Sequence, residues 1–164
     1  MEMLSAKRMA NMGAVAALYV VTTMLAAPLA YGQVQFRVSE MLMLLCFFNK
    51  DYVVSLTLGC FIANIFSPLG FIDAGFGTMA TLIAALLIYF TRKKVNLFVA
   101  SLFPVISNAL IVGMELKIVE DLPFWVNAGW VALGEFVCVS VLGVTIFHRL
   151  SRNKKFMEMV SAEK

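Results

Sequence analysis

The sequence predicts an all-α polytopic membrane protein with six transmembrane helices. Hydrophobic residues make up 62% of the 164 residues and charged residues only 14%, whereas a soluble domain carries about 25% charged residues. The mean hydropathy is +0.90. Six apolar stretches are separated by short polar connections, and the basic residues collect at alternate connections. No repeat, low-complexity tract or linker interrupts them, so residues 1–164 are expected to form one domain.

The first predicted helix covers residues 8–27 and ends near Pro28. Its apolar stretch, from Met9 to Ala27, has 19 residues. That is longer than the apolar core of a signal peptide and long enough to cross a bilayer. We therefore expect a retained transmembrane helix, although Lys7 and Arg8 precede it as basic residues precede a signal sequence.

Two shorter helices are predicted next, at 39–49 and 51–66. Ser39 is a good helix cap, and Lys50 marks an aqueous boundary between the two helices. The second ends before Ser67 and Pro68, where proline cannot continue a helix. Both are shorter than the roughly 20 residues that a simple span needs, so they are expected to be buried by other helices.

Three further helices complete the prediction. The fourth, 77–91, follows the turn-rich stretch 68–77, and the fifth covers 95–115. A polar connection, 115–123, leads to the sixth helix, 124–148.

The distribution of charge predicts that both termini are cytoplasmic. With six spans, eleven of the thirteen basic residues fall on the side of the termini, and only Arg37 and Lys117 fall on the other. Cytoplasmic segments of membrane proteins carry the excess of Lys and Arg. Acidic residues are biased toward the outer half, which should therefore attract cations. They are Glu40, Asp73, Glu115, Glu120, Asp121 and Glu135.

The loop after the first helix is the main polar interruption of the chain. Val34, Phe36 and Val38 alternate with Gln33, Gln35 and Arg37. This period of two predicts extended backbone. At about 1.5 Å per helical residue, Glu40 then lies roughly 15 Å from Lys50, near the middle of a bilayer. A carboxylate at that depth usually faces a cavity or a partner.

Four more polar residues are predicted at one depth in the membrane. Each lies thirteen or fourteen residues from the charged residue that marks its nearest cytoplasmic boundary, which corresponds to about 20 Å. A ligand site needs polar groups that converge in this way. The four residues are Asn64, Thr78, Asn108 and Glu135.

Each of these polar residues also has a purely structural interpretation. Asn64 and Asn108 are of the type that hydrogen-bonds between membrane helices, and the Thr78 hydroxyl can bond to its own helix backbone. Glu40 can pair with Arg37, three residues earlier. Trp125 and Trp130 fit an aromatic belt, although either can stack on a ligand ring. Glu135 has no basic residue near it in sequence, so a functional role is favoured.

The sequence excludes several other classes of function. A net charge of +3 is too small to indicate a nucleic-acid binder. The three cysteines are isolated in apolar segments, which indicates core residues and neither disulfides nor a metal site. No Ser–His pair, HExxH or Cys–His arrangement lies in the predicted spans, so an intramembrane enzyme is not indicated, and no cofactor is expected. A chain without GxxxxGK[ST] cannot itself supply an ATPase.

Small residues form a stripe on the first helix. Ala6, Ala10 and Ala14 recur every four residues, with Gly13 and Ala17 beside them. Small-xxx-small spacing lets another helix approach closely.

Taken together, these features resemble the substrate-binding S components of energy-coupling factor (ECF) vitamin transporters. Gln35, Arg37-Val38-Ser39 and Glu40 are similar to the motif of the QueT family of presumed queuosine-precursor transporters. The resemblance covers nearly the whole chain. It implies a multi-pass protein of the cell membrane whose Ala10 and Ala14 dock a separate transmembrane coupling component, driven by two cytoplasmic ATPases.

The resemblance also implies a cationic deazapurine as ligand. In 7-aminomethyl-7-deazaguanine an ammonium group lies at one end and the N–H donors of the guanine edge at the other. One carboxylate can neutralise the ammonium while a second accepts the guanine donors. Asn64 or Asn108 could bind the carbonyl oxygen. An S component for another vitamin such as thiamine, or a scaffold subunit without a ligand, remains an alternative.

Overall fold

The structure is a computed structural model that describes residues 6–32 and 34–161. Over those residues it is all-helical, without a strand, which confirms the all-α part of the predicted fold class. The elements are α1 (Ala6–Leu25), α2 (Ala27–Ala30), η1 (Val38–Phe47), α3 (Asp51–Ile65), α4 (Phe71–Thr91), α5 (Leu97–Glu120), α6 (Phe124–Glu135), η2 (Phe136–Gly143), α7 (Val144–Leu150) and α8 (Lys154–Val160).

Within residues 6–32 and 34–161, four segments are long and apolar enough to cross a membrane. They are Ala6–Leu25, Phe71–Thr91, Leu97–Glu120 and Phe124–Leu150. The apolar elements η1 and α3 are shorter than a span, as the sequence predicts. Length and composition therefore confirm a membrane protein.

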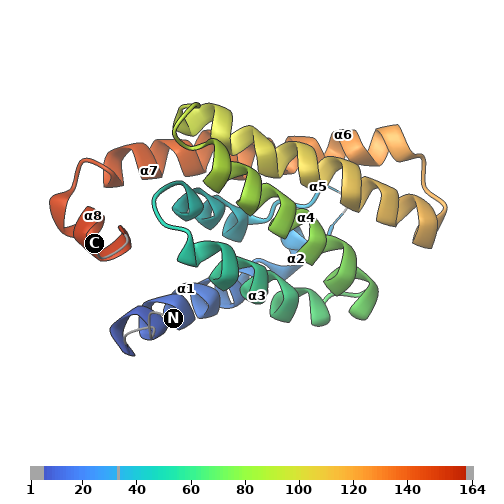
Figure 1. Ribbon diagram of the computed structural model, residues 1–164. Coiled ribbons are helices and arrows are strands. Elements are labelled where there is room, and N and C mark those ends of the chain that lie inside the picture. The colour runs from blue at the N-terminus through green and yellow to red at the C-terminus, as the bar shows by residue number, and fades with distance from the viewer. Residues whose placement is uncertain (1–5, 33, 162–164) are drawn as a thin grey trace.

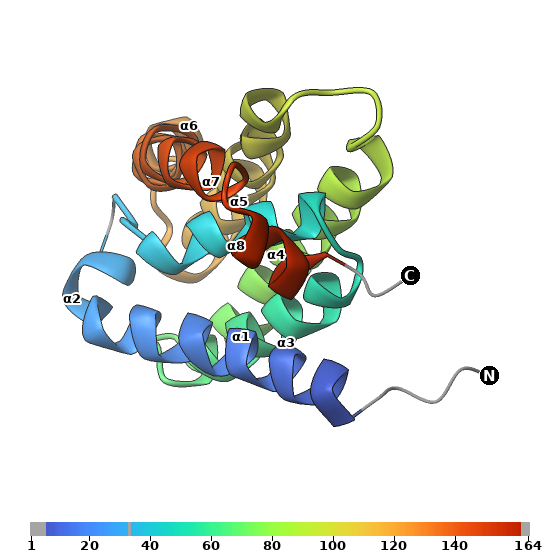
Figure 2. The same ribbon diagram turned by 90° about the vertical axis from the view of Figure 1, so that its left-hand side faces the viewer.

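The long helices are arranged in chain order around a central segment. α1 packs on α3, α3 on α4, α4 on α5 and α5 on α6. The central segment is η1, which contacts α1, α3, α4, α5, η2 and α7. Viewed along the bundle in Figure 2, η1 lies inside the ring of the other helices. Its side chains Met43, Leu44 and Cys46 are fully buried.

The central segment is a 3₁₀-helix and not the predicted α-helix. Ten residues of 3₁₀-helix are unusually many, and at about 2.0 Å per residue they reach about 20 Å, against about 15 Å for an α-helix. The predicted cap at Ser39 is wrong, because Arg37 is the N-cap and Ser39 lies inside η1. The Ser39 hydroxyl instead accepts a hydrogen bond from Thr23 of α1, at 2.7 Å.

Two predicted helix boundaries are also wrong. α4 begins at Phe71 and not at 77, directly after Gly70, whose φ of +55° makes the turn. α5 continues to Glu120 and not to 115, where Asp121 (φ +53°) ends it in the left-handed conformation. Asp73 and Glu115 consequently lie within helices, and they are 5% and 1% exposed. On the predicted boundaries both would lie in or beside loops, where a solvated loop face would account for them, and their burial shows that interpretation to be wrong.

The last span runs from α6 through the π-helix η2 to α7, within two residues of the predicted end. η2 packs closely on η1, since a Cβ placed on Gly143 would lie 3.0 Å from Met41 Cβ. Beyond it, α8 was not predicted from the sequence. It folds back so that the Phe156 ring lies 6.2 Å from that of Phe147. Both described chain ends therefore lie at one end of the bundle, opposite the α3–α4 and α5–α6 turns (Figure 1).

Candidate functional site

The loop between α2 and η1 turns its polar side chains inward. Gln35 and Arg37 are 7% and 1% exposed, while Val34 and Phe36 are only half-buried. Burial thus alternates with the predicted period of two over 34–37, although Gln33 lies outside the described residues. The backbone is not extended throughout, because Gln35 has a φ of +48°.

This loop lies directly on α6, at Gly134. A Cβ added to Gly134 would collide with the Val34 carbonyl oxygen and lie 2.7 Å from that of Gln35. Only glycine allows the backbone of the loop to approach the helix so closely at this point. The loop is therefore held immediately beside Glu135, the next residue of α6.

Arg37 is the one basic side chain that is buried among residues 6–32 and 34–161. Its Nη2 donates to Asp73 Oδ1 at 3.3 Å, and its Nε donates to the Ala30 carbonyl oxygen at 3.4 Å. Its Nη1 has no hydrogen-bond partner in the described part of the chain. The ion pair between Arg37 and Glu40 considered from the sequence is wrong, since Asp73 takes that place.

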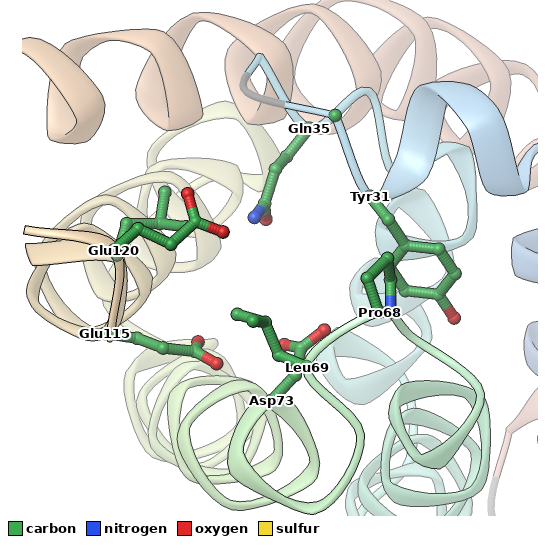
Figure 3. A pocket seen from close by; sticks show the side chains of 9 residues that line it. Tyr31, Gln35, Pro68, Leu69, Asp73, Glu115 and Glu120 are labelled. Carbon is green, nitrogen blue, oxygen red and sulfur yellow. The ribbon is translucent and has the colours of Figure 1, made fainter. Parts of the chain in front are cut away.

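A cavity of about 270 Å³ lies between this loop, the start of α4 and the end of α5. The Gln35 amide enters it from the loop, and the carboxyl groups of Glu115 and Glu120 approach from α5 (Figure 3). Both oxygens of Glu115 and the amide oxygen of Gln35 are buried without a partner among the described residues. The lining residues are Tyr31, Gly32, Gln35, Pro68, Leu69, Asp73, Glu115, Leu116 and Glu120.

Glu40 lies below the loop, in the first turn of η1, and is 0% exposed. Tyr19 of α1 donates a hydrogen bond to its Oε1, and Thr81 of α4 donates to the same oxygen at 3.4 Å. Its Oε2 has no partner among the described residues. One oxygen of this carboxyl group is thus held by the protein and the other is not.

Glu135 and Asn108 lie near Glu40. They are 0% and 1% exposed. Asn108 is close enough to both glutamates to interact with each, and the glutamates interact with one another. The two oxygens of Glu135 have no hydrogen-bond partner among the described residues. The same is true of the amide nitrogen and the amide oxygen of Asn108.

The other predicted site residues lie further from this group. Asn64 donates to the Asp73 carbonyl oxygen at 3.3 Å and so links α3 to α4, in line with its structural interpretation. Thr78 is half-buried, and its hydroxyl has no partner among the described residues. Trp130 is 44% exposed and Trp125 79% exposed on α6, consistent with an aromatic belt.

Sequence reasoning missed Tyr19 and Thr81, the two hydroxyl donors to Glu40. Neither residue is charged, and nothing in the sequence indicates which hydroxyl in an apolar helix faces a carboxylate. Thr81 lies three residues after Thr78, so the depth argument reached the correct helix but not the correct turn.

The buried polar groups carry an excess of negative charge. Four carboxyl groups, those of Glu40, Asp73, Glu115 and Glu135, are each at most 5% exposed. Arg37 forms an ion pair with one of them, Asp73, at 3.3 Å. No group of three or more His, Cys, Asp and Glu side chains suited to a metal ion occurs in the described residues. Such an arrangement suits an organic cation that also donates hydrogen bonds.

The small residues of α1 lie on the outside of the bundle. Ala10, Gly13, Ala14 and Ala17 are all exposed, and a Cβ on Gly13 would meet nothing within 4 Å. The opposite face of α1 is buried on α3 and η1.

Comparison with known proteins points to one family. A curated relative, the queuosine precursor transporter QueT of Lactococcus lactis subsp. cremoris (strain MG1363), is 36% identical over 152 residues, covering 84% of this chain and 88% of that protein. No solved structure matches the chain. The profile of the QueT transporter family matches residues 9–152. The chain therefore belongs to the QueT transporter family.

Proposed function

We propose that this transporter is the substrate-binding S component of an ECF importer and that it captures a queuosine precursor, 7-aminomethyl-7-deazaguanine or a related base. The related Lactococcus protein is named a queuosine precursor transporter. The observation that supports a cationic ligand is the buried cluster of four carboxyl groups around the single guanidinium of Arg37. As a transporter the chain is not an enzyme, and ATP is hydrolysed by separate partners.

The unpartnered atoms of the cluster match the chemistry of such a ligand. The carboxylate oxygens of Glu40 and Glu135 accept hydrogen bonds from an ammonium group or from the guanine edge, each bond worth roughly 1.5–3 kcal/mol. The amide of Asn108 and the Nη1 of Arg37 can donate to the carbonyl oxygen of the base. Glu115, Asp73 and Gln35 line the cavity, so a cation that enters it meets hydrogen-bond acceptors.

The proposed topology has six spans, with both termini in the cytoplasm. The turn after η1, the α4–α5 turn and both described chain ends gather at the basic end of the bundle (Figure 1). The positive-inside rule then places that end in the cytoplasm. The cavity, at the opposite end, opens to the outside, as an importer requires.

The proposed partners bind the cytoplasmic half of α1. Its exposed face of Ala10, Gly13, Ala14 and Ala17 suits close helix packing. The resemblance to ECF S components supplies the occupant, a transmembrane coupling component that carries two ATPases. The lipid bilayer covers the remaining apolar surface, which includes Phe71 and Phe90.

Ligand-induced thermal stabilisation of the purified full-length protein tests this proposal. A ligand at a hundred times its Kd stabilises a two-state protein by about 2.7 kcal/mol. We expect 7-aminomethyl-7-deazaguanine to give the largest shift, its neutral 7-cyano analogue a smaller one, and thiamine none. A shift with thiamine alone would reassign the substrate, and no shift with any compound would favour a scaffold subunit.

The loop on Gly134 is expected to close over bound ligand, and trypsin can report this. Arg37 is buried in the loop and, on the proposed topology, is one of two outward-side basic residues. In outward-facing vesicles, ligand should slow cleavage after Arg37. Gly134→Ala should speed it several-fold, because the added Cβ would displace the loop backbone.

Gly129→Ala is the matched control for this experiment. It lies on the same helix, and an added Cβ meets nothing within 4 Å. Cleavage after Arg37 that responds neither to saturating ligand nor to Gly134→Ala would contradict a lid.

A further inference from the structure

We propose that Tyr19 couples ligand binding to the position of α1, so that the same helix which docks the coupling component also senses whether the site is occupied. This inference rests on the proposed function, in that it takes Glu40 as a ligand group and α1 as the docking helix. It assigns to Tyr19 a positioning role that neither the family nor the relative specifies.

Two side-chain hydrogen bonds join α1 to the start of η1. Tyr19, 1% exposed, donates its hydroxyl to Glu40 Oε1. One turn later Thr23, 2% exposed, donates to the Ser39 hydroxyl at 2.7 Å. Among the described residues, two side chains of α1 and one of α4 therefore hydrogen-bond to the first turn of η1, which carries Glu40.

The buried and exposed faces of α1 lie on one rigid element. Ala16, Tyr19 and Thr23 form its buried face. Below Tyr19 the helix rests on α3, because a Cβ on Gly59 would lie 2.9 Å from the Ala16 carbonyl oxygen and 3.0 Å from Tyr19 Cβ. This close contact is a natural pivot. A displacement at Tyr19 must therefore tilt or rotate the exposed face that carries Ala10 and Ala14.

Tyr19 and the ligand compete as donors to the Glu40 carboxylate, and the relative strengths of their hydrogen bonds indicate which donor it prefers. In the bond from the Tyr19 phenol only the acceptor, the Glu40 carboxylate, is charged, whereas an ammonium group also brings a full opposite charge and therefore binds the carboxylate more strongly. A cationic ligand that binds Glu40 therefore draws the carboxylate away from Tyr19. In the empty protein the Tyr19 bond holds α1 in one position, and in the loaded protein α1 is released from it.

A label at position 14 tests the inference on the isolated full chain in lipid nanodiscs. Cys46, Cys60 and Cys138 are buried, so Ala14→Cys provides one exposed thiol on the docking face. We expect saturating 7-aminomethyl-7-deazaguanine to change the spectrum of a spin label there. Tyr19→Phe should already give the spectrum of the loaded protein without ligand, and should bind the ligand about two- to tenfold more tightly.

Tyr52→Phe is the matched control. Tyr52 is 3% exposed on α3, and its hydroxyl makes no hydrogen bond within the described residues. The Tyr52→Phe protein should show the same ligand-dependent change in the spin-label spectrum as the parent. A Tyr19→Phe protein that keeps the parent's ligand-dependent spectral change would overturn the inference while leaving the proposed function intact. Absence of ligand binding by the parent itself would overturn both.

A second variant covers the case in which Tyr19→Phe fails to fold. Thr23→Val keeps the shape of the side chain and removes its hydroxyl, and with it the bonds to Ser39 and to the Tyr19 carbonyl oxygen of its own helix. We expect it to reduce the ligand-dependent spectral change at position 14 while the ligand still binds. If Thr23→Val binds ligand and shows the full change, α1 does not report occupancy through η1.

Discussion

Glu135→Gln and Glu40→Gln are each expected to lower the affinity for 7-aminomethyl-7-deazaguanine at least tenfold. Both side chains are 0% exposed, and glutamine keeps their shape while removing the charge. The loss of one charge-assisted hydrogen bond, roughly 1.5–3 kcal/mol, corresponds to a change of about tenfold or more. Titration calorimetry on the purified variants measures the effect.

The neutral 7-cyano analogue separates the roles of the two carboxylates. Replacing the glutamate that faces the ammonium should abolish the difference in affinity between the amine and the nitrile. The glutamate on the guanine edge should bind both compounds more weakly by about the same factor. Glu158→Gln, exposed on α8, is the control for a change of charge. Unchanged affinity in both glutamine variants would refute a central carboxylate site.

Ala14→Leu is expected to abolish uptake by the assembled transporter and to leave ligand binding by the isolated chain nearly unchanged. Ala14 is exposed, so the larger side chain does not enter the interior of this protein. It does prevent another helix from approaching α1 closely. Ala10→Leu should act in the same way. Radiolabelled uptake in cells and binding to the purified chain provide the two measurements.

Gly129→Leu is a suitable control for Ala14→Leu. It adds a leucine to an exposed position on α6, where a Cβ meets nothing within 4 Å. Uptake should persist in this control. If Ala14→Leu reduces binding and uptake equally, the substitution has damaged the fold, and the docking role of α1 loses its support.

The sequence predicts the helices better than their ends. Apolar length identifies each long segment, but the glycines between 68 and 77 suggest a loop where α4 already begins. Gly77 lies inside α4, where the absence of a side chain leaves room for neighbouring side chains. A Cβ there would collide with Asn64 Nδ2 and lie 3.4 Å from Arg37 Nη1. Packing between membrane helices thus outweighs the local preference of glycine for turns.

One part of the geometry of the candidate site can be predicted from the sequence, and another part cannot. Distance along a helix gives depth, so Asn108 and Glu135 could be placed at one level in advance, with Glu40 a little deeper. Direction around the helix axis depends on packing, so the contacts of Tyr19 and Thr81 with Glu40 could not. Asp73 and Glu115 were missed for a further reason, since the helix ends that bury them were themselves misplaced.

The packing of η1 against η2 has a consequence for how the protein is made. Glu40 enters the membrane early in synthesis, but the contact between Met41 and Gly143 requires the last span. Until that span leaves the ribosome and inserts, the central segment lacks one of its walls. A chain that stops after α5 therefore leaves η1 uncovered on the side where Met41 meets Gly143, so η1 reaches its final packing only when synthesis is nearly complete.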